Sequence, residues 1–279
     1  ADGMARWETP SAVDEISVSG GPLTPYTASA GLAPQPIEAQ VYLRKPDPAL
    51  ASKYLDATSR YIRMYNELIG PYPYQKFALV ENFWETGYGM PSYTLLGPQI
   101  IRFPFILTSS YPHEILHNWW GNSVYVDYGT GNWCEGLTAY LADHLMKEIE
   151  GQGAVYRRDV LKKYRDFAAV SADFPLKDFR SRHSAATEAV GYGKTLMGFH
   201  ELRMLVGDEL FRQSLRTFYK DYRGTRASFG DVRAAFEKTT GRDLARFFDD
   251  WVNRTGAADL AVADVKVAAA GGRFTVTGN

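Results

Sequence analysis

The sequence predicts an α+β protein, because strand-like and helix-like segments follow one another in blocks instead of alternating. Before residue 112, short apolar runs with strand character surround one long helical segment. After Pro112, apolar residues recur at helical spacing through many consecutive segments, and from Leu260 onward alternating Val and Ala indicate strands again. We therefore expect a body in which strands come first and helices follow.

The first part of the chain contains weak strand signals and one strong helix signal. Residues 1–46 are rich in Gly, Pro, Ser and Thr, with strand-like pieces at 15–18 and 39–43. We interpret this region as an edge segment or as the tail of a preceding β domain. Residues 47–69 have apolar positions at helical spacing, and Gly70 is expected to end that helix.

Strands are predicted between this helix and Pro112. Residues 76–80 have the pattern of a buried strand. Residues 84–97 combine three glycines and a proline with aromatic side chains, which indicates an irregular strand or loop beside a cleft. Residues 100–106 are a further strand candidate, although Pro104 limits the pairing that this strand could make.

The rest of the sequence predicts mostly helices, and glycines lie between consecutive helices. The expected helical segments are 113–120, 135–149, 154–170, 188–206, 208–222, 229–239 and 242–252. We expect three regions: the N-terminal segment 1–46, a main domain at 47–256, and the start of a following β region at 257–279.

Composition excludes several classes of protein. The 279 residues are 45% hydrophobic and 23% charged, which excludes a mainly disordered chain. The net charge of −1 lacks the basic excess typical of proteins that bind nucleic acid or anionic membranes. No apolar run is long enough to span a bilayer. The single cysteine, Cys134, excludes an intramolecular disulfide and a cysteine-rich zinc site.

The ends of the sequence suggest part of a longer polypeptide. The chain starts at Ala1 without an initiator Met or a signal-peptide pattern, and residues 273–277 have strand character at the other end. We expect further domains of the same polypeptide, and the compartment stays open.

The strongest chemical signal is the sequence HEILH at 113–117. On a helix, His113 and His117 lie one turn apart on the same face, so both imidazoles can bind one metal ion. Glu114 lies about 100° around the helix from His113, where its carboxylate can reach a metal-activated water without binding the metal. The alternative is a buried helix with two core histidines.

A catalytic zinc site needs three protein ligands and one open position. Glu135, at the start of the next predicted helix, is the best third candidate. The glycines at 129 and 131 allow the chain to turn back toward the histidines. The alternative is a first-turn carboxylate stabilised by the helix dipole. Two histidines and a glutamate are a recurring catalytic set, which favours Glu135 as a ligand.

These residues resemble a known family. The sequence HEILHNWWGN at 113–122 and the later NWCEGLTAY at 132–140 are similar to motifs of the gluzincin metallopeptidases of the aminopeptidase N and leukotriene hydrolase type. The resemblance extends over residues 61–251, from before the PYPY sequence at 71–74 to the closing FFDDW at 247–251. It implies a thermolysin-like catalytic domain with one Zn²⁺ ion, built as a small mixed β-sheet lobe followed by a mainly α-helical lobe. It also implies a preceding β domain and following domains.

The spacing of the motif departs slightly from the family pattern. Seventeen residues separate His117 from Glu135, one fewer than the family usually has. Gly136 cannot replace Glu135 as a ligand, so a one-residue deletion in the glycine-rich connection is the simplest explanation.

Tyr192 is the candidate for stabilising negative charge. The sequence GYGKT at 191–195 resembles the family's Tyr-Glu-Lys-Gly motif, whose tyrosine hydroxyl stabilises the oxyanion. A phenol is a neutral donor that can direct one hydrogen bond at developing negative charge. The alternative is an ordinary tyrosine packed with its polar end in water.

The candidate substrate loop departs most from the family. The loop that contains Gly87, Tyr88, Gly89 and Met90 lies where the family has a Gly-x-Met-Glu-Asn motif, whose glutamate binds the substrate's free α-amine, and we align Met90 with the Met of that motif. Here Pro91 and then Ser92 stand where the Glu and Asn belong. We expect Gly87–Met90 to form a backbone platform beside the peptide, without that amine anchor. The alternative is a tight aromatic turn.

Two nearby glutamates could replace the anchor. Glu81 or Glu85 would serve only if the fold brings one of them to the cleft. The other histidines, His144, His183 and His200, are expected to be surface or core residues, and Cys134 a buried thiol.

The resemblance implies a zinc-dependent, aminopeptidase-like peptidase that acts on peptide substrates. Because Pro91 replaces the amine-binding Glu, a zinc endopeptidase or another hydrolase on the same scaffold is the alternative. A third hypothesis is a non-catalytic, zinc-stabilised module. Glu114 and Tyr192 together argue against it, because a module without catalysis would not need either residue.

Overall fold

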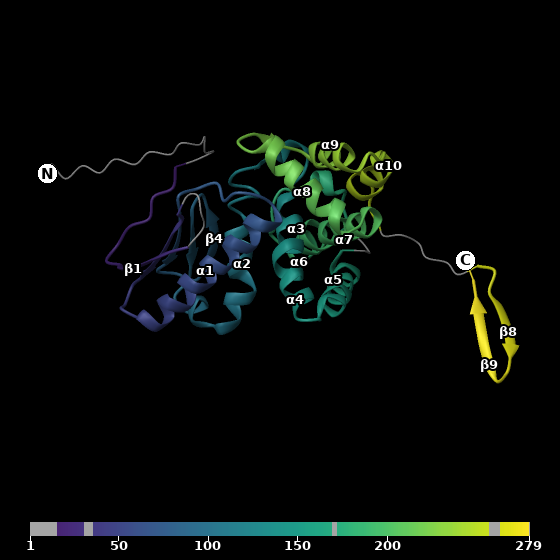
Figure 1. Cartoon of the computed structure of the whole chain (residues 1–279), viewed down its shortest axis with the longest axis horizontal. Helices are drawn as coiled ribbons and strands as arrows, with labels where there is room; N and C mark the ends of the chain where they lie inside the picture. The colour runs from purple at the N-terminus through teal and green to yellow at the C-terminus, as the bar shows by residue number, and fades with distance from the viewer. Residues whose placement is uncertain (1–15, 31–35, 169–171, 257–262, 279) are drawn as a thin grey trace.

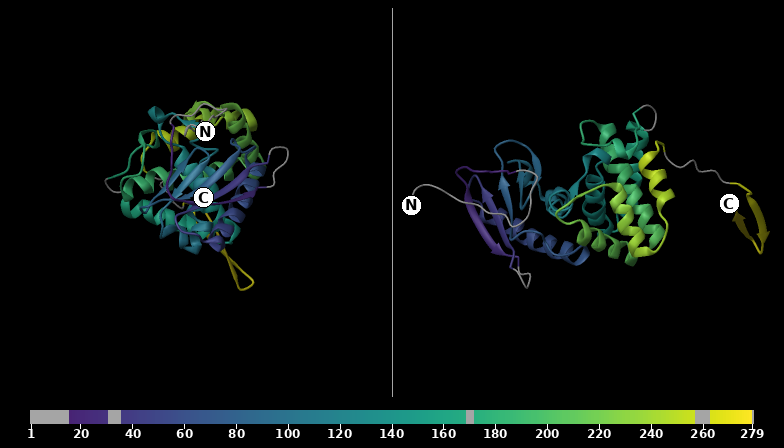
Figure 2. Two further views of the ribbon diagram at one scale, coloured as in Figure 1. Left: turned by 90° about the vertical axis from the view of Figure 1, so that its left-hand side faces the viewer. Right: turned by 90° about the horizontal axis from the view of Figure 1, so that it is seen from above.

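The computed structural model describes residues 16–30, 36–168, 172–256 and 263–278. A sheet flanked by a long helix lies beside a group of mostly helical elements (Figure 1), and Figure 2 shows the same two parts from other directions. This arrangement confirms the predicted α+β class, with strands before helices along the chain.

The sheet has the strand order β1-β2-β3-β5-β4. Its strands are β1 (Thr24–Ser29), β2 (Glu38–Leu43), β3 (Lys76–Glu81), β4 (Gly87–Met90) and β5 (Tyr93–Leu96). β2, β3 and β5 are parallel, whereas β1 and β4 pair antiparallel at the two edges. β4 therefore has one side without a strand neighbour in the described sheet.

In the N-terminal region, β1 and β2 belong to the same sheet as β3, with β1 at its edge. The strand predicted at 15–18 is wrong for residues 16–18, which have no regular structure, and Glu15 lies outside the described residues. The domain boundaries after residues 46 and 256 stay predictions.

Helix α1 (Pro48–Leu68) packs against the sheet through its buried side chains. Asp47 caps its first turn by accepting a hydrogen bond from the backbone N–H of Leu50. The buried hydroxyl of Tyr54 donates to the Ile101 carbonyl, and that of Tyr61 donates to the Leu107 carbonyl. α1 thus holds the segment that leads from the sheet into the helical part.

That connecting segment corrects one prediction. Residues 100–106 are not a strand but belong to two 3₁₀ turns, η1 (Ile100–Arg102) and η2 (Pro104–Thr108). Pro104 lacks the N–H that a strand would need for pairing and has the fixed φ that suits the first position of a helical turn. The apolar run fills the core with Ile101 and Ile106 instead.

The helical part begins with α2 (Ser110–Leu116), which ends four residues before the predicted end at 120. The other α-helices are α3 (Cys134–Ala139), α4 (Leu145–Ile149), α5 (Gly153–Phe167), α6 (Ala185–Glu188), α7 (Thr195–Val206), α8 (Asp208–Tyr222), α9 (Phe229–Thr240) and α10 (Ala245–Phe248). The predicted helix at 154–170 corresponds to α5, although residues 169 and 170 lie outside the described residues.

Short elements interrupt this helical series. The 3₁₀ turns are η3 (Tyr128–Thr130) and η5 (Leu176–Asp178), and the π-helical segments are η4 (Tyr140–His144), η6 (Ala189–Lys194) and η7 (Asp249–Asn253). β6 (Tyr125–Val126) pairs with β7 (Arg226–Ala227). η4 joins α3 to α4 and η6 joins α6 to α7, so two predicted long helices each contain a π-helical turn.

Buried tryptophans after α2 connect the sheet part to the helical part. The Trp119 indole donates to the Gly70 carbonyl beyond the end of α1. The Trp133 indole donates to the Ala227 carbonyl in β7, and its ring packs edge-on against Phe218 of α8. These contacts fix the loop that follows α2.

The predicted strands near the C-terminal end are present as the hairpin of β8 (Lys266–Ala270) and β9 (Arg273–Thr277), which lies apart from the helices in Figure 1. Residues 260–262 of that prediction lie outside the described residues. Among the described residues, no helix has the length and apolar character that crossing a membrane requires.

Candidate metal centre

A cleft of about 880 Å³ lies between the sheet edge and the helical part. Gly87, Tyr88 and Gly89 of β4 line one wall. The helical elements supply the other wall, including the residues of the predicted site: His113, Glu114, His117, Glu135 and Tyr192. The fold therefore brings residues from distant parts of the sequence to one cavity.

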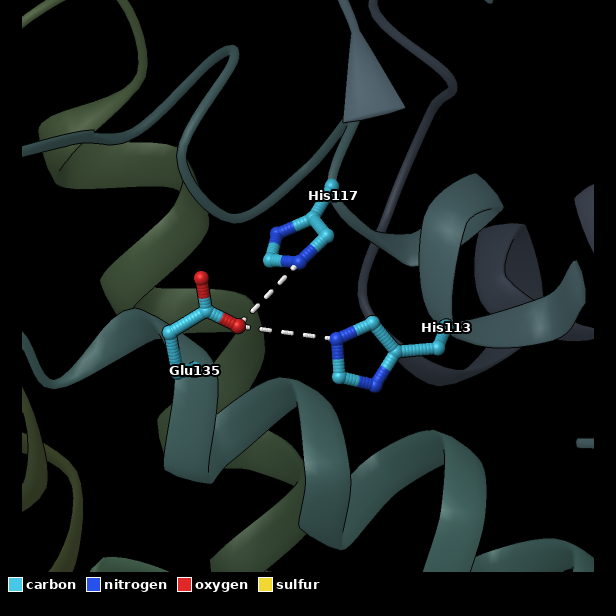
Figure 3. A group of neighbouring side chains, drawn as sticks. All are labelled: His113, His117 and Glu135. Atoms are coloured by element: carbon cyan, nitrogen blue, oxygen red, sulfur yellow. Dashed lines mark ion pairs between the residues drawn. The ribbon is translucent and has the colours of Figure 1, made fainter. Parts of the chain in front are cut away.

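Three predicted ligands point toward a common centre (Figure 3). The Nε2 atoms of His113 and His117 each lie 3.5 Å from Oε2 of Glu135. One donor atom from each residue lies within 4.8 Å of the other two, a grouping that could hold a metal ion. His113 lies in α2, His117 directly follows the last residue of α2, and Glu135 lies in the first turn of α3, so the connection that is one residue short still brings the glutamate to the histidines.

The second nitrogen of each imidazole is held by a partner outside this group. His113 Nδ1 lies 2.7 Å from Oδ2 of Asp143, and His117 Nδ1 lies 3.1 Å from the Trp120 carbonyl. These contacts favour the tautomer with the proton on Nδ1, which leaves each Nε2 lone pair directed at the centre. Two imidazole nitrogens and a carboxylate oxygen suit a zinc ion.

Asp143 contacts the candidate ligand His113, and the sequence reasoning did not single it out. It lies eight residues after Glu135 in the same predicted helix, about 80° around a regular helix from Glu135, so the helical period gave no signal that the two side chains share a face. Asp143 lies within the π-helical segment η4, whose wider turn departs from the regular helical period, and there its carboxylate contacts His113.

The charges at the centre are strongly coupled. Burial alone would lower the pKa of His113, but the Asp143 carboxylate and the hydrogen bond to Glu135 raise it to about 10. Burial would likewise lower the pKa of His117, yet Glu135 raises it well above its usual range. Burial raises the pKa of Glu135, but the two histidines overcome that effect and hold it well below its usual range. The carboxylates thus favour positive charge at the point where the donors meet.

Glu114 lies beside the same centre, and a glycine makes room for it. A Cβ atom on Gly89 would lie only 2.8 Å from Oε2 of Glu114 and 3.2 Å from Cβ of His117. Burial raises the pKa of Glu114, and the neighbouring His113 and His117 partly offset this rise. A carboxylate with a raised pKa accepts a proton more readily, as a general base must.

Tyr192 lies on η6, on the helical side of the cleft. Its ring stacks beside that of His113 with 6.4 Å between the ring centres, and Glu135 lies close enough to influence its hydroxyl. Burial and the Glu135 carboxylate raise the pKa of Tyr192, so its hydroxyl keeps its proton. Gly191 allows this placement, because a Cβ there would lie 2.2 Å from the Phe179 ring.

The predicted substrate loop lies at the cleft only in part. Gly87, Tyr88 and Gly89 line it, whereas Met90 pairs with Tyr93 and is not among the described lining residues. Ser92 turns the chain with a φ of 68°, and its N–H donates to the Asn118 side chain. A turn after Met90 and a strand before it are thus both present.

Neither candidate replacement for the amine anchor reaches the cleft. Glu81 is buried, pairs with Arg102 at 2.7 Å and accepts the backbone N–H of Arg44. Glu85 accepts the backbone N–H groups of Gln99 and Ile100. Both carboxylates therefore stabilise the sheet part, and neither is among the described lining residues.

The remaining histidines and the cysteine lie outside the group of donors. His144 is fully buried, and its Nε2 lies 2.8 Å from Arg157, while His200 Nδ1 lies 3.2 Å from the Tyr140 hydroxyl. Cys134 is a buried free thiol whose sulfur lies 3.5 Å from His117 Nδ1.

The fold and the donor group define a metallopeptidase-like domain, and comparison with known proteins identifies the family. Residues 107–251 match the peptidase family M1 domain. The chain belongs to peptidase family M1.

Relatives of known sequence include glutamyl aminopeptidase from Sus scrofa, 26% identical over 166 residues that make up 56% of this chain and 17% of the relative. Leucine aminopeptidase 2 from Emericella nidulans is 25% identical over 280 residues, covering 88% of this chain and 43% of the relative. The chain therefore spans less than half of the length of these relatives.

Solved structures share the fold. The M1 zinc metallopeptidase from Deinococcus radiodurans superposes with a TM-score of 0.68 at 22% identity, over 86% of this chain and 53% of that protein. Native yeast LTA4 hydrolase superposes with a TM-score of 0.64 at 14% identity, over 84% of this chain and 40% of that protein. These similarities establish the shared fold, including a small sheet and a mainly helical part.

Proposed function

We propose that the protein is a zinc-dependent peptidase of the aminopeptidase type. The observation that carries this proposal is the convergence of His113, His117 and Glu135, with Glu114 and Tyr192 lining the same cleft. A variant of the Deinococcus radiodurans enzyme has been crystallised with a Tyr-Ser-Ala substrate, which supports peptides as the substrate class. Names of the sequence relatives, such as glutamyl aminopeptidase, support the aminopeptidase type.

His113, His117 and Glu135 would hold the zinc ion. When bound, zinc polarises the scissile carbonyl and lowers the pKa of water toward neutrality. Asp143 and the Trp120 carbonyl keep both imidazoles oriented for this role through their contacts with Nδ1.

Glu114 acts as the general base. It removes a proton from the attacking water and then delivers a proton to the leaving amine. Its raised pKa brings the carboxylate closer to the range in which both transfers are efficient.

Tyr192 stabilises the oxyanion that forms as the peptide carbonyl is attacked. The hydroxyl is protonated, lies on the side of Glu135, and can donate one hydrogen bond toward the developing charge. Its ring is supported by His113 and Phe179, so the donor is held in place before the substrate arrives.

The peptide binds along β4. This strand is at the edge of the sheet, and its residues at 87–89 line the cleft, so an extended peptide could add as a further strand. Gly87 and Gly89 allow the peptide backbone to approach closely, because neither has a side chain.

An endopeptidase on the same scaffold is the second candidate. Pro91 and Ser92 stand in place of the amine anchor, and Glu81 and Glu85 bind other partners. A peptidase without such an anchor would not require a free α-amine. Comparing hydrolysis of one peptide with a free and with an acetylated N-terminus separates the two candidates, because an aminopeptidase must reject the blocked peptide.

The test of the proposed function is Glu114→Gln in the zinc-loaded protein. This change removes the base and keeps the shape of the side chain, so we expect kcat to fall at least about a hundredfold while one zinc ion stays bound. The readouts are cleavage of an unblocked peptide mixture and metal content by mass spectrometry. Full activity in the variant would contradict the role of Glu114, and zinc binding without turnover in the unchanged chain would instead support a non-catalytic module.

A further inference from the structure

The cleft contains charged residues that the proposed chemistry does not use. Apart from the metal centre, with Glu114 and Asp143, the charged residues among its described lining are Lys163, Arg180, Arg182 and Glu188. They come from α5, from the loop before α6 and from α6 itself, all on the helical wall. Three cations thus face one anion on this wall.

Arg180 holds the loop in place. Its guanidinium donates to the carbonyls of Lys177 at 2.6 Å, Phe179 at 3.1 Å and Gly129 at 3.2 Å. The Asn132 side chain donates to the Arg180 carbonyl at 3.0 Å. These bonds tie the loop to the segment just before Glu135, so the position of Arg182 is set by the same framework as the metal centre.

Lys163 and Arg182 form what we call the cationic rim. Lys163 Nζ lies 3.1 Å from one oxygen of Glu188, and Arg182 Nη1 lies 3.4 Å from the other. One carboxylate cannot neutralise two cations, so the rim keeps a surplus positive charge. The side chains of Lys163 and Arg182 are 60% and 58% exposed, and exposed ion pairs are weak enough to exchange partners readily.

The rim lies close to the reacting atoms. The Arg182 guanidinium carbon lies 5.7 Å from the centre of the Tyr192 ring, which is itself 6.4 Å from the His113 ring. An extended peptide advances about 3.3 Å per residue. A group held by the rim would therefore belong to a residue within about three positions of the scissile bond.

Apart from the Glu114 carboxylate, which lies beside Gly89, the described lining of the opposite wall contains no charged side chain. Gly87, Tyr88 and Gly89 supply this wall, and the position of the family's amine-binding carboxylate is occupied by Pro91. Electrostatic attraction therefore favours an anionic group on the helical side over a cationic group on the sheet side.

We propose that the cationic rim of Lys163 and Arg182 binds a carboxylate of the peptide substrate near the scissile bond. This inference rests on the proposed function and adds its substrate class: peptides with an acidic side chain or with a free C-terminal carboxylate a few residues from the cleaved bond. Glu188 competes with the substrate for both cations.

The experiment compares matched peptides that differ only in this charge. One pair has Glu or Gln next to the scissile bond, and a second pair ends in a free carboxylate or an amide. In the unchanged protein, kcat/KM should be about fivefold higher for the carboxylate member of at least one pair. The pair that responds identifies the source of the carboxylate, and the preference should shrink at high salt.

Three variants test whether the rim causes the preference. Lys163→Gln should reduce it by about half or more, whereas Glu188→Gln should increase it, because the competing carboxylate is gone. Lys162→Gln is the matched control: Lys162 is the neighbouring residue on α5, pairs with Asp159 at 3.6 Å and does not line the cleft. It should leave the preference unchanged.

Binding measurements keep this inference separate from the proposed function. Dissociation constants of the same peptide pairs are measured with the zinc-loaded Glu114→Gln variant, so the comparison does not depend on turnover. Equal affinity for the two peptides of both pairs would overturn the proposed carboxylate site. So would an equal loss of the preference for the carboxylate peptide in Lys162→Gln and Lys163→Gln. Preferential binding without cleavage by the unchanged protein would support the site and contradict the peptidase function.

Discussion

The two walls of the cleft work in different ways. On the helical wall, polar contacts fix the two histidines, with Asp143 against His113 and the Trp120 carbonyl against His117. On the sheet wall, β4 offers mainly backbone, and its glycines matter because they leave space. Under the proposed function, the helical wall would carry the chemistry and the sheet wall would set how closely the peptide can approach.

The largest expected effect comes from filling the space on the sheet wall. Gly89→Ala would place a methyl group 2.8 Å from Oε2 of Glu114 and displace that carboxylate. We expect kcat/KM to fall about a hundredfold, the usual cost of misplacing a catalytic group by about 1 Å.

Gly87→Ala is the matched control for this prediction. It lies on the same strand, but its Cβ would be 3.7 Å from the nearest Glu114 oxygen, an ordinary contact distance. Steady-state kinetics on one peptide should therefore show a small loss for Gly87→Ala. An equal loss of kcat/KM in the two variants would mean that both glycines are needed for the conformation of the strand and that Gly89 is not needed to make space for Glu114.

The next effect is expected on the helical wall. Asp143→Asn keeps the shape of the side chain but removes the charge that orients and supports His113. We expect zinc affinity to fall about tenfold to hundredfold, measured by competition with a chelating dye. Asp159→Asn on the exposed face of α5 is the control, and unchanged affinity in Asp143→Asn would show that Asp143 does not support the ligand.

The smallest effect concerns His144, which follows Asp143 in η4 and is fully buried. Burial lowers the pKa of His144 from 6.5 to about 4. Between these two values the unfolded chain binds the proton more readily, so the folded state loses stability as pH falls through this window. At pH 5 the loss relative to neutral pH is about 2 kcal/mol.

His144→Gln should remove this part of the pH dependence. The free energy of unfolding is measured by urea denaturation at neutral pH and near pH 5, for the unchanged protein and for the variant. Subtracting the pH-dependent change of the variant from that of the unchanged protein removes the contribution of the other titrating groups. The same pH response in the variant would show that His144 is not held neutral by burial.

The sequence predicted those features that depend on spacing within one helix or on a short motif. The separation of His113 and His117 by one turn places both side chains on one helix face whatever the rest of the fold does. Glu135 was predicted from a motif and a chemical requirement for a third ligand, and the structure brings it to the histidines.

Features that depend on tertiary packing were not predictable in the same way. The apolar run at 100–106 has the pattern of a strand or of a core-facing turn, and Pro104 together with the contacts to the neighbouring α1 favours the turn. The π-helical turn η4 is an irregularity of one residue that a helical period does not show, so Asp143 was missed. The partners of Glu81 and Glu85 likewise come from segments distant in sequence.

Locating the metal by anomalous scattering tests the central claim most directly. Diffraction data from zinc-loaded crystals, collected above and below the zinc absorption edge, should show one peak bonded to Nε2 of His113, Nε2 of His117 and the Glu135 carboxylate at about 2.0–2.2 Å. Zinc bound elsewhere, or a zinc-loaded cleft in which Glu135 lies out of reach of the ion, would contradict the account.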